Sequence, residues 1–182
     1  MKVPAQICYL VFLLVVSLQI SEMQFGQENC QVVSATASFS IPHRRDPLAL
    51  NVDPKSEMWA NAASAWITKD CTKTLDYPNL KTQVRAFWTD DFLYLLFVCP
   101  YEVLNLFLPP QNDKPRHGLW DRDVVEMFLG SDWNNIGHYR EFEIAPTGDW
   151  IELAINFDLK TRQTADEINW SSGWQRMAKI DE

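Results

Sequence analysis

A two-residue alternation of apolar and polar side chains, repeated in several segments, most constrains what this chain can fold into. It runs through residues 82–99, TQVRAFWTDDFLYLLFVC, and through residues 139–157, YREFEIAPTGDWIELAINF. Each run is interrupted by turn-forming residues, Thr89–Asp91 in the first and Pro146–Asp149 in the second. Alternation on both sides of a short turn predicts an antiparallel hairpin.

The segments between the hairpins are less regular. Residues 58–68, MWANAASAWIT, fit either a short helix or a turn followed by a strand, and the proline-rich residues 100–118 predict a long loop. No segment forms a convincing amphipathic helix. The sequence therefore predicts an all-β fold, an antiparallel β-sandwich of immunoglobulin-like or jelly-roll-like type.

The ten residues 119–128, LWDRDVVEMF, combine an aromatic ring, several carboxylates and a further strand. We expect this strand to begin with Trp120 and to alternate from Val124, which places Glu126 and Met127 on opposite faces. Trp120 would then offer a flat apolar surface beside the Glu126 carboxylate. Sugars stack their C–H faces on such rings and donate hydroxyl hydrogen bonds to such acids. The alternative is a core tryptophan and a solvated acidic edge.

Composition limits the class of protein and of partner. A chain of 182 residues, 47% of them hydrophobic, is long enough for one domain and is not a disordered chain. Its net charge of −8 argues against a nucleic-acid partner, because phosphates require a basic surface. A neutral or cationic ligand is favoured over a polyanion.

The first residues are expected to be a targeting segment rather than part of the fold. Lys2 precedes an apolar run, residues 7–16, that is too short to cross a bilayer. We assign residues 1–21 to a signal peptide, with a buried helix as the alternative, and residues 22–45 to a leader. The protein is then secreted, periplasmic or extracellular, and no later apolar run is long enough for a membrane span.

An exported chain can form disulfides. Cys30, Cys71 and Cys99 follow the signal segment, and a Cys71–Cys99 bridge is the preferred pairing because the segment before Cys71 could run alongside the strand that ends at Cys99. Two buried thiols are the alternative. The cysteine and histidine spacings do not indicate zinc.

Four segments, in this order, resemble a carbohydrate-binding module of family 9, within the DOMON-like β-sandwiches. They are DPLALNVDPKSEMW, VRAFWTDDFLYLLFVC, LWDRDVVEMFLG and YREFEIAPTGDWIELAI, and the likeness covers about residues 46–182. Its most specific element is W-x-x-D-x-V-E-x-F. The resemblance implies non-catalytic binding of an oligo- or polysaccharide, associated with polysaccharide breakdown. The sugar would stack on Trp120 and bond to Glu126, with support from Asp123, Tyr139 and Glu143.

The chain also departs from this family. An arginine that binds sugar in the family is replaced near Glu143, and the second clamping tryptophan lies in strands expected after residue 182. The domain is therefore expected to lack its C-terminal strands.

Other functions remain open. One is a glycosidase that uses Glu126 with Glu141 or Glu143. Another is a DOMON-type haem or redox domain with axial ligands from Met127, His117 or His138, and a third is an extracellular domain without a ligand. The resemblance also allows a structural calcium ion, for which the candidate ligands are Asp121, Asp123 and Asp132.

Overall fold

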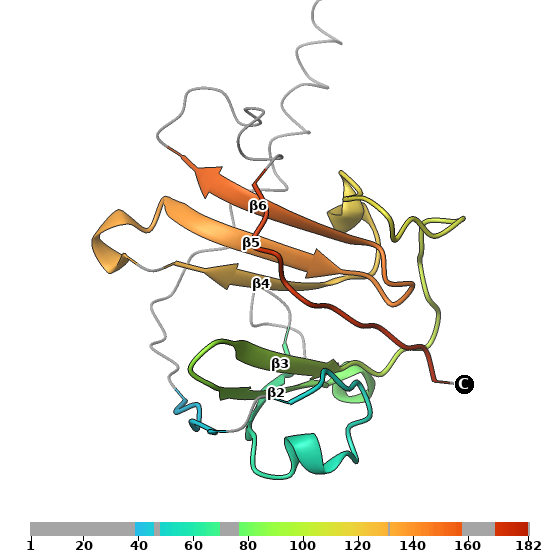
Figure 1. The fold of residues 1–182 in the computed structure, drawn as a ribbon. Coiled ribbons are helices and arrows are strands. Elements are labelled where there is room, and N and C mark those ends of the chain that lie inside the picture. The colour runs from blue at the N-terminus through green and yellow to red at the C-terminus, as the bar shows by residue number, and fades with distance from the viewer. Residues whose placement is uncertain (1–38, 46–47, 70–76, 131, 158–169, 182) are drawn as a thin grey trace, which may run out of the picture. The chain divides into compact units, whose positions relative to one another are not determined.

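The strands of the protein form two separate three-stranded antiparallel sheets (Figure 1). The structure is a computed structural model that describes residues 39–45, 48–69, 77–130, 132–157 and 170–181. The first sheet has the order β1 (Ala63–Ile67), β2 (Thr82–Trp88) and β3 (Leu93–Val98), and the second has the order β4 (Val125–Leu129), β5 (His138–Ile144) and β6 (Trp150–Asn156). Within these ranges there is no α-helix, which confirms the predicted all-β class.

Both predicted hairpins are present. The β2–β3 turn is closed by Thr89, whose backbone N–H donates to the Phe92 carbonyl at 2.8 Å and whose hydroxyl accepts from the Phe92 N–H at 3.2 Å. The β5–β6 turn is closed by the Ala145 N–H, which donates to the Asp149 carbonyl, and by the Gly148 N–H, which donates to the Ala145 carbonyl; Gly148 lies at φ 87°. A side chain is strained at this φ, so glycine suits the position.

Short 3-10 turns connect the strands: η1 (Glu57–Trp59), η2 (Pro78–Leu80), η3 (Leu119–Asp121) and η4 (Trp133–Asn135). The ambiguous segment 58–68 is a turn followed by a strand, since η1 precedes β1. Ser56 caps η1 by accepting a hydrogen bond from the Met58 N–H at 3.3 Å. Of the part of the chain that is described, no helix has the length and apolarity needed to cross a bilayer.

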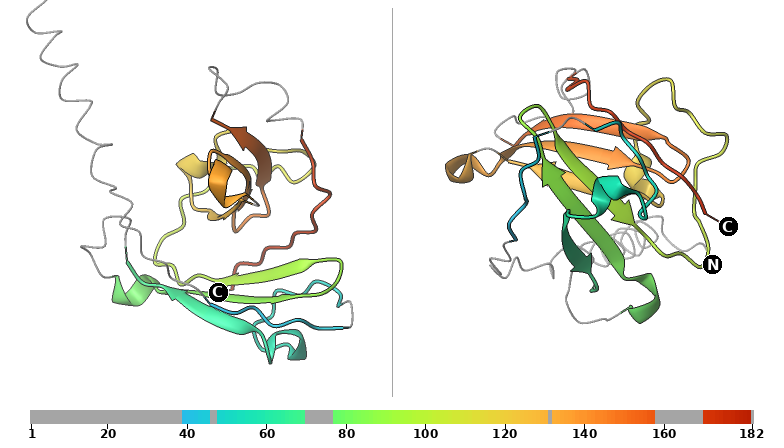
Figure 2. Two further views of the ribbon diagram at one scale, coloured as in Figure 1. Left: turned by 90° about the vertical axis from the view of Figure 1, so that its left-hand side faces the viewer. Right: turned by 60° about the horizontal axis from the view of Figure 1, so that its bottom comes forward.

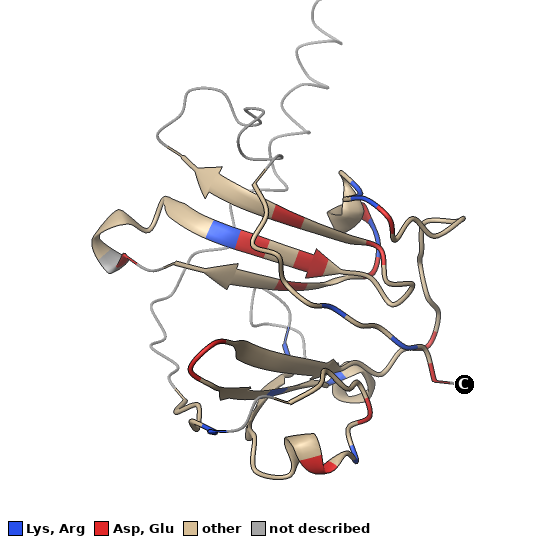
Figure 3. Ribbon diagram, in the orientation of Figure 1, with Lys and Arg blue, Asp and Glu red and all other residues tan. Residues whose placement is uncertain are grey.

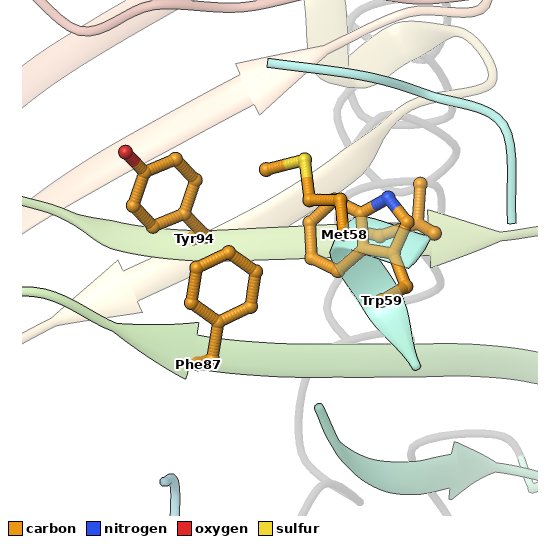
Figure 4. Close-up of a cluster of buried hydrophobic side chains, with 5 residues drawn as sticks. Met58, Trp59, Phe87 and Tyr94 are labelled. Carbon is orange, nitrogen blue, oxygen red and sulfur yellow. The ribbon is translucent and has the colours of Figure 1, made fainter. Parts of the chain in front are cut away.

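One hydrophobic cluster covers a face of the β1–β3 sheet (Figure 4). Met58 and Trp59 of η1 pack there with Phe87, Tyr94 and Leu96. Phe87 and Tyr94 are cross-strand partners, and their rings stack with centroids 4.5 Å apart. Such aromatic pairs stabilise a sheet by roughly 0.5–1.5 kcal/mol beyond the area they bury.

A second cluster belongs to the β4–β6 sheet. Leu119, Ala145, Ile151 and Leu153 are buried there, and partly buried neighbours include Phe107. Each sheet therefore has its own buried cluster. Both sheets lie within one compact unit of the chain, residues Phe39–Ile67 and Asn79–Glu182; the other unit, Met1–Ser38 and Thr68–Pro78, falls almost entirely outside the described residues.

Residues 170–176, part of the C-terminal segment that Figures 1 and 2 show in red, pack on the opposite face of the β4–β6 sheet. The Trp170 and Trp174 rings lie 5.9 and 5.3 Å from the Phe142 ring, and the Arg176 guanidinium lies 3.6 Å from the centroid of a Trp150 ring. Buried Glu152 accepts hydrogen bonds from Ser171 and Ser172 at 2.6–3.0 Å. These contacts fix the segment on β5 and β6.

Candidate functional site

Three glutamates lie together on one face of β4 and β5. In the antiparallel register Glu126 is opposite Glu143, and Phe128 is opposite Glu141. Directly paired residues point to the same face of a sheet, so these four side chains share a face with Tyr139, two residues before Glu141. We call it the acidic face: Glu126, Phe128, Tyr139, Glu141 and Glu143. Figure 3 shows the acidic residues that the β4–β6 sheet carries.

The β6 positions that continue this face are apolar. Ile151 is opposite Glu143, Leu153 is opposite Glu141, and both belong to the second hydrophobic cluster. The only Lys or Arg in the three strands is Arg140, which alternates onto the other face and lies 4.9 Å from a Trp170 ring. The acidic face therefore has no basic residue at any strand position.

Glu143 has no exposed surface. Neither of its carboxyl oxygens has a hydrogen-bond partner among the described residues. Burial, the neighbouring Glu141 carboxyl and the charge of Glu126 raise the pKa of Glu143 from 4.5 to about 9. Glu143 is therefore a buried acid, paired on β6 with Ile151 of the second hydrophobic cluster.

Glu126 remains open to solvent, and Glu141 is half-buried. Burial and, to a smaller extent, the charge of Glu141 raise the pKa of Glu126. Chemically, the face can accept hydrogen bonds from hydroxyl or ammonium groups at Glu126 and Glu141, while Glu143 lies protonated behind them.

Aromatic rings continue the acidic face away from the apolar cluster. Phe128 is 57% exposed, and its ring lies edge-on to Tyr139 at 5.6 Å. The Phe157 ring, also exposed, lies 5.9 Å from Tyr139. The alternation of β4 already placed Phe128 on the same side as Glu126, but no sequence motif marked Phe128 or Phe157 as part of a site.

Trp120 lies on η3, five residues before Val125, the first residue of β4. The expectation that a strand begins at Trp120 is wrong, because Gly118 adopts a left-handed conformation at φ 77° and opens a tight turn. Within this turn the Asp121 and Arg122 N–H groups donate back to the carbonyls of Gly118 and Leu119.

The turn that carries Trp120 lies against β5. The preceding Leu119 is fully buried with Ile151 and Leu153, the cross-strand neighbours of Glu143 and Glu141, and η3 contacts β5. The Trp120 ring itself is 41% exposed and meets the His117 ring edge-on at 4.9 Å. It is a surface aromatic, not a core residue.

The loop before η3 is tied to the rest of this site. The Asp123 carboxylate accepts from the Asn105 N–H at 2.7 Å, and the Asp123 N–H donates to the Asn105 carbonyl at 3.0 Å. The guanidinium groups of Arg116 and Arg122 lie 5.2 and 4.5 Å from the centroid of the Phe107 ring. Asp123 thus supports the turn that presents Trp120.

A buried ion pair holds the same loop to the β5–β6 turn. Asp149, which has no exposed surface, accepts from the Arg116 Nε at 2.6 Å, from the Gln111 N–H at 2.7 Å and from the Thr147 hydroxyl. Burial alone would raise the pKa of Asp149, but the hydrogen bonds from these three residues outweigh it and lower that pKa.

The three calcium candidates do not converge. Asp121 and Asp123 precede β4, whereas Asp132 follows it and caps η4 by accepting from the Asn134 N–H at 2.9 Å. A five-residue strand spans about 16 Å, several times the length of a calcium–oxygen bond. Among the residues that the structure describes, no group of three His, Cys, Asp or Glu side chains could hold a metal ion.

The remaining candidates are placed as follows. Met127 and His138 project from the same face of one sheet, whereas axial haem ligands approach the iron from opposite sides. Cys99 is exposed just after β3, and its pKa is raised by burial of the thiol, an effect reduced by a hydrogen bond with Thr82. Cys71, its expected disulfide partner, lies outside the described residues, as do residues 1–21 and most of the leader.

Comparison with known proteins gives no relative: no family model, no curated protein and no solved structure matches this chain.

Proposed function

We propose that this protein is a non-catalytic carbohydrate-binding module, similar to those of family 9, that is exported and works beside enzymes of polysaccharide breakdown. The observation that supports this most is the exposed Trp120 ring on a turn anchored beside the acidic face, which carries the solvent-accessible Glu126. A flat ring next to a hydrogen-bond acceptor is what recognition of a pyranose requires.

The expected affinity is modest. Stacking on one aromatic ring contributes on the order of 1 kcal/mol beyond the buried area, and a hydrogen bond to a charged group contributes about 1.5–3 kcal/mol. Much of this favourable free energy is offset by the translational and rotational freedom that the sugar loses on binding. Together these values, about 2.5–4 kcal/mol, correspond to dissociation constants in the millimolar range.

Calorimetric titration with glucan and xylan oligosaccharides tests the proposal. Trp120→Ala should abolish the heat of binding, whereas Trp66→Ala, which removes another exposed tryptophan (59% exposed, on β1), should not change it. Equal binding by the parent protein and Trp120→Ala would refute the stacking platform.

Glu126 is the second group in the proposal. Glu126→Gln keeps one acceptor oxygen and should weaken binding less than Glu126→Ala, because an amide oxygen still accepts a hydroxyl hydrogen bond. Identical affinities for the two variants and the parent would exclude Glu126 from the sugar contact.

A glycosidase is the second candidate, because the register pairs a solvent-accessible carboxylate with a protonated one. General acid catalysis uses such a pair, with one acid kept protonated near neutral pH. Against it stands the complete burial of Glu143, which leaves no surface for a glycosidic oxygen. Hydrolysis of an aryl glycoside that is lost in Glu126→Gln would favour the enzyme over the binding module.

We further infer that the two sheets pack as an antiparallel sandwich. The support is that β2 and β3 are apolar on both faces: Val84, Ala86 and Leu95 lie opposite the face that holds Phe87 and Tyr94. Methyl-to-methyl nuclear Overhauser contacts between Leu95 and residues of the β4–β6 sheet would test this packing, and their absence would contradict it.

A further inference from the structure

The acidic face carries a feature that recognition of a neutral sugar does not require. Of the buried acids in the described residues, Asp149 accepts from Arg116, Gln111 and Thr147, and Glu152 accepts from Ser171 and Ser172. Glu143 is equally buried, yet neither oxygen has a donor from the described residues. Native proteins rarely leave a buried polar group unsatisfied, and such groups concentrate at functional sites.

The groups around Glu143 add to the free-energy cost of burying its carboxyl group. From β4 it faces Glu126, from its own strand Glu141, and from β6 only the apolar Ile151 and Leu153. Like charges on neighbouring strands repel each other, and no Lys or Arg on these strands compensates them on this face. A cation bound on this face would relieve the repulsion between these carboxylates and favour the ionised form of Glu143.

From this arrangement we propose that the preferred ligand is a cationic amino sugar, an oligosaccharide of glucosamine units, whose ammonium group binds between Glu126 and Glu141 in front of Glu143. The inference rests on the proposed sugar-binding function and names its substrate class. Glu126 and Glu141 make the contact, and Glu143 acts behind them as a positioning residue.

The spacing of the carboxylates suits an organic cation better than a metal ion. Adjacent strands place paired Cβ atoms about 4.5–5.5 Å apart, and residues two apart along a strand are separated by about 6.6 Å. In the described residues no three acids converge closely enough for a metal. An ammonium group on a pyranose ring donates in three directions and can bridge such separated acceptors, and the exposed Phe128 ring shares the face of Glu126 and Glu141.

The test compares three oligosaccharides of equal length by calorimetry at about pH 6, where an amine with a pKa near 7.7–8.0 or somewhat lower is charged. The glucosamine oligomer is cationic, its N-acetylated form is neutral, and the glucose oligomer has a hydroxyl at that position. We expect the glucosamine oligomer to bind about tenfold tighter or more than either neutral oligomer, as one charge-assisted hydrogen bond provides.

The role of Glu143 is tested by measuring the proton that it releases when the ligand binds. A bound ammonium favours the ionised form of its neighbours, so binding of the glucosamine oligomer at about pH 8, closer to the Glu143 pKa of about 9, should release part of the Glu143 proton. The release is measured by repeating the titration in buffers of different ionisation enthalpy. Glu143→Gln, checked for a parent-like thermal unfolding transition, should remove this proton release and reduce the preference over the neutral oligomers.

Controls separate this site from general attraction to an acidic protein of net charge −8. Glu102→Gln removes the same charge from an exposed loop residue and should preserve the preference. An oligolysine of equal charge should not compete with the glucosamine oligomer; full competition by it would overturn the proposal.

The outcomes distinguish the two proposals. If neutral oligomers bind as tightly as the glucosamine oligomer and Trp120→Ala abolishes both, the module stands and the amino-sugar inference fails. If no oligomer binds the parent protein, both fail. A tenfold preference that persists unchanged in Glu126→Gln and Glu143→Gln would also overturn the inference.

Discussion

Asp149 joins three parts of the chain and should carry a large share of the stability of the β4–β6 sheet. Its carboxylate holds Arg116 and Gln111 of the loop before η3 and Thr147 of its own turn, and it has no exposed surface. Arg116 also donates from its Nη2 to the Pro109 carbonyl at 2.9 Å. Asp149→Ala would leave the Arg116 guanidinium, whose side chain is 20% exposed, without its carboxylate partner.

The size of the loss follows from that burial. Removing one partner of a buried ion pair costs about 3–5 kcal/mol, and the partial exposure of Arg116 places the effect at the lower end, about 3 kcal/mol. Domains unfold with free energies of about 5–15 kcal/mol, so the loss is a large fraction of the total. At about 2–4 °C per kcal/mol for a chain of this size, the melting temperature should fall by roughly 6–12 °C.

Asp149→Asn separates charge from hydrogen bonding. The amide oxygen can still accept from the Gln111 N–H and the Arg116 Nε, so the expected loss is smaller, about 1–2 kcal/mol. The folded-state pKa of Asp149 is lowered, so its ionisation stabilises the fold above the unfolded-state pKa of about 3.9. This contribution is lost as the pH falls through the folded-state pKa, and the difference between the parent and Asp149→Asn should shrink over that range.

Urea titration followed by circular dichroism measures these changes, with an unchanged m-value as the sign of an intact native state. Asp113→Ala, at an exposed position of the same loop, is the matched control and should stay within about 0.5 kcal/mol of the parent. A loss of less than about 1 kcal/mol in Asp149→Ala would refute the view that this ion pair fixes the loop.

Three further changes give independent tests. Glu143, with a folded-state pKa of about 9, retains a proton that the unfolded chain loses above about pH 4.5, so parent stability should fall as the pH rises between these values. Glu143→Gln should flatten this decline by up to about 1.4 kcal/mol per pH unit in urea titrations, and parallel profiles would contradict the burial argument. Glu152→Ala should release Ser171 and Ser172 and destabilise the fold by about 1–3 kcal/mol, with faster amide exchange at Ser172 as the local readout. Gly118→Ala, at φ 77°, should cost about 1–2 kcal/mol and weaken sugar binding through the position of Trp120; unchanged stability would show that the turn tolerates a side chain.

The hairpins could be predicted because their signals are local. Alternation identifies β2, β3, β5 and β6 directly, and the residues at Thr89–Asp91 and Pro146–Asp149 can only turn the chain. The face on which each side chain lies can be predicted as well. A period of two places Glu126 and Met127 on different faces of the sheet, whatever surrounds the strand. Antiparallel pairing within each hairpin needs no long-range information.

The burial of Glu143 could not be predicted in this way. Its two neighbours across the sheet, Glu126 and Ile151, come from different strands, and the β4–β5 register joins residues 17 positions apart in the sequence. A strand face rich in acids usually contacts water, whereas here Glu143 lies beside Ile151, which belongs to a cluster with Leu119 and Leu153. Likewise, nothing local to Trp170 and Trp174 indicates that they pack on Phe142.

Stability and ligand preference should therefore depend on the same residue. A protonated, unsatisfied carboxyl lowers the free energy of unfolding at neutral pH, and Glu143→Gln removes that cost. The variant could gain stability at about pH 8 and also lose the preference for glucosamine oligomers. In that case the free-energy cost of burying Glu143 is linked to ligand recognition, because the ligand relieves an unfavourable feature of the free protein. If it gains stability but keeps the preference, Glu143 is a strained core residue and the ammonium group is recognised by Glu126 and Glu141 alone.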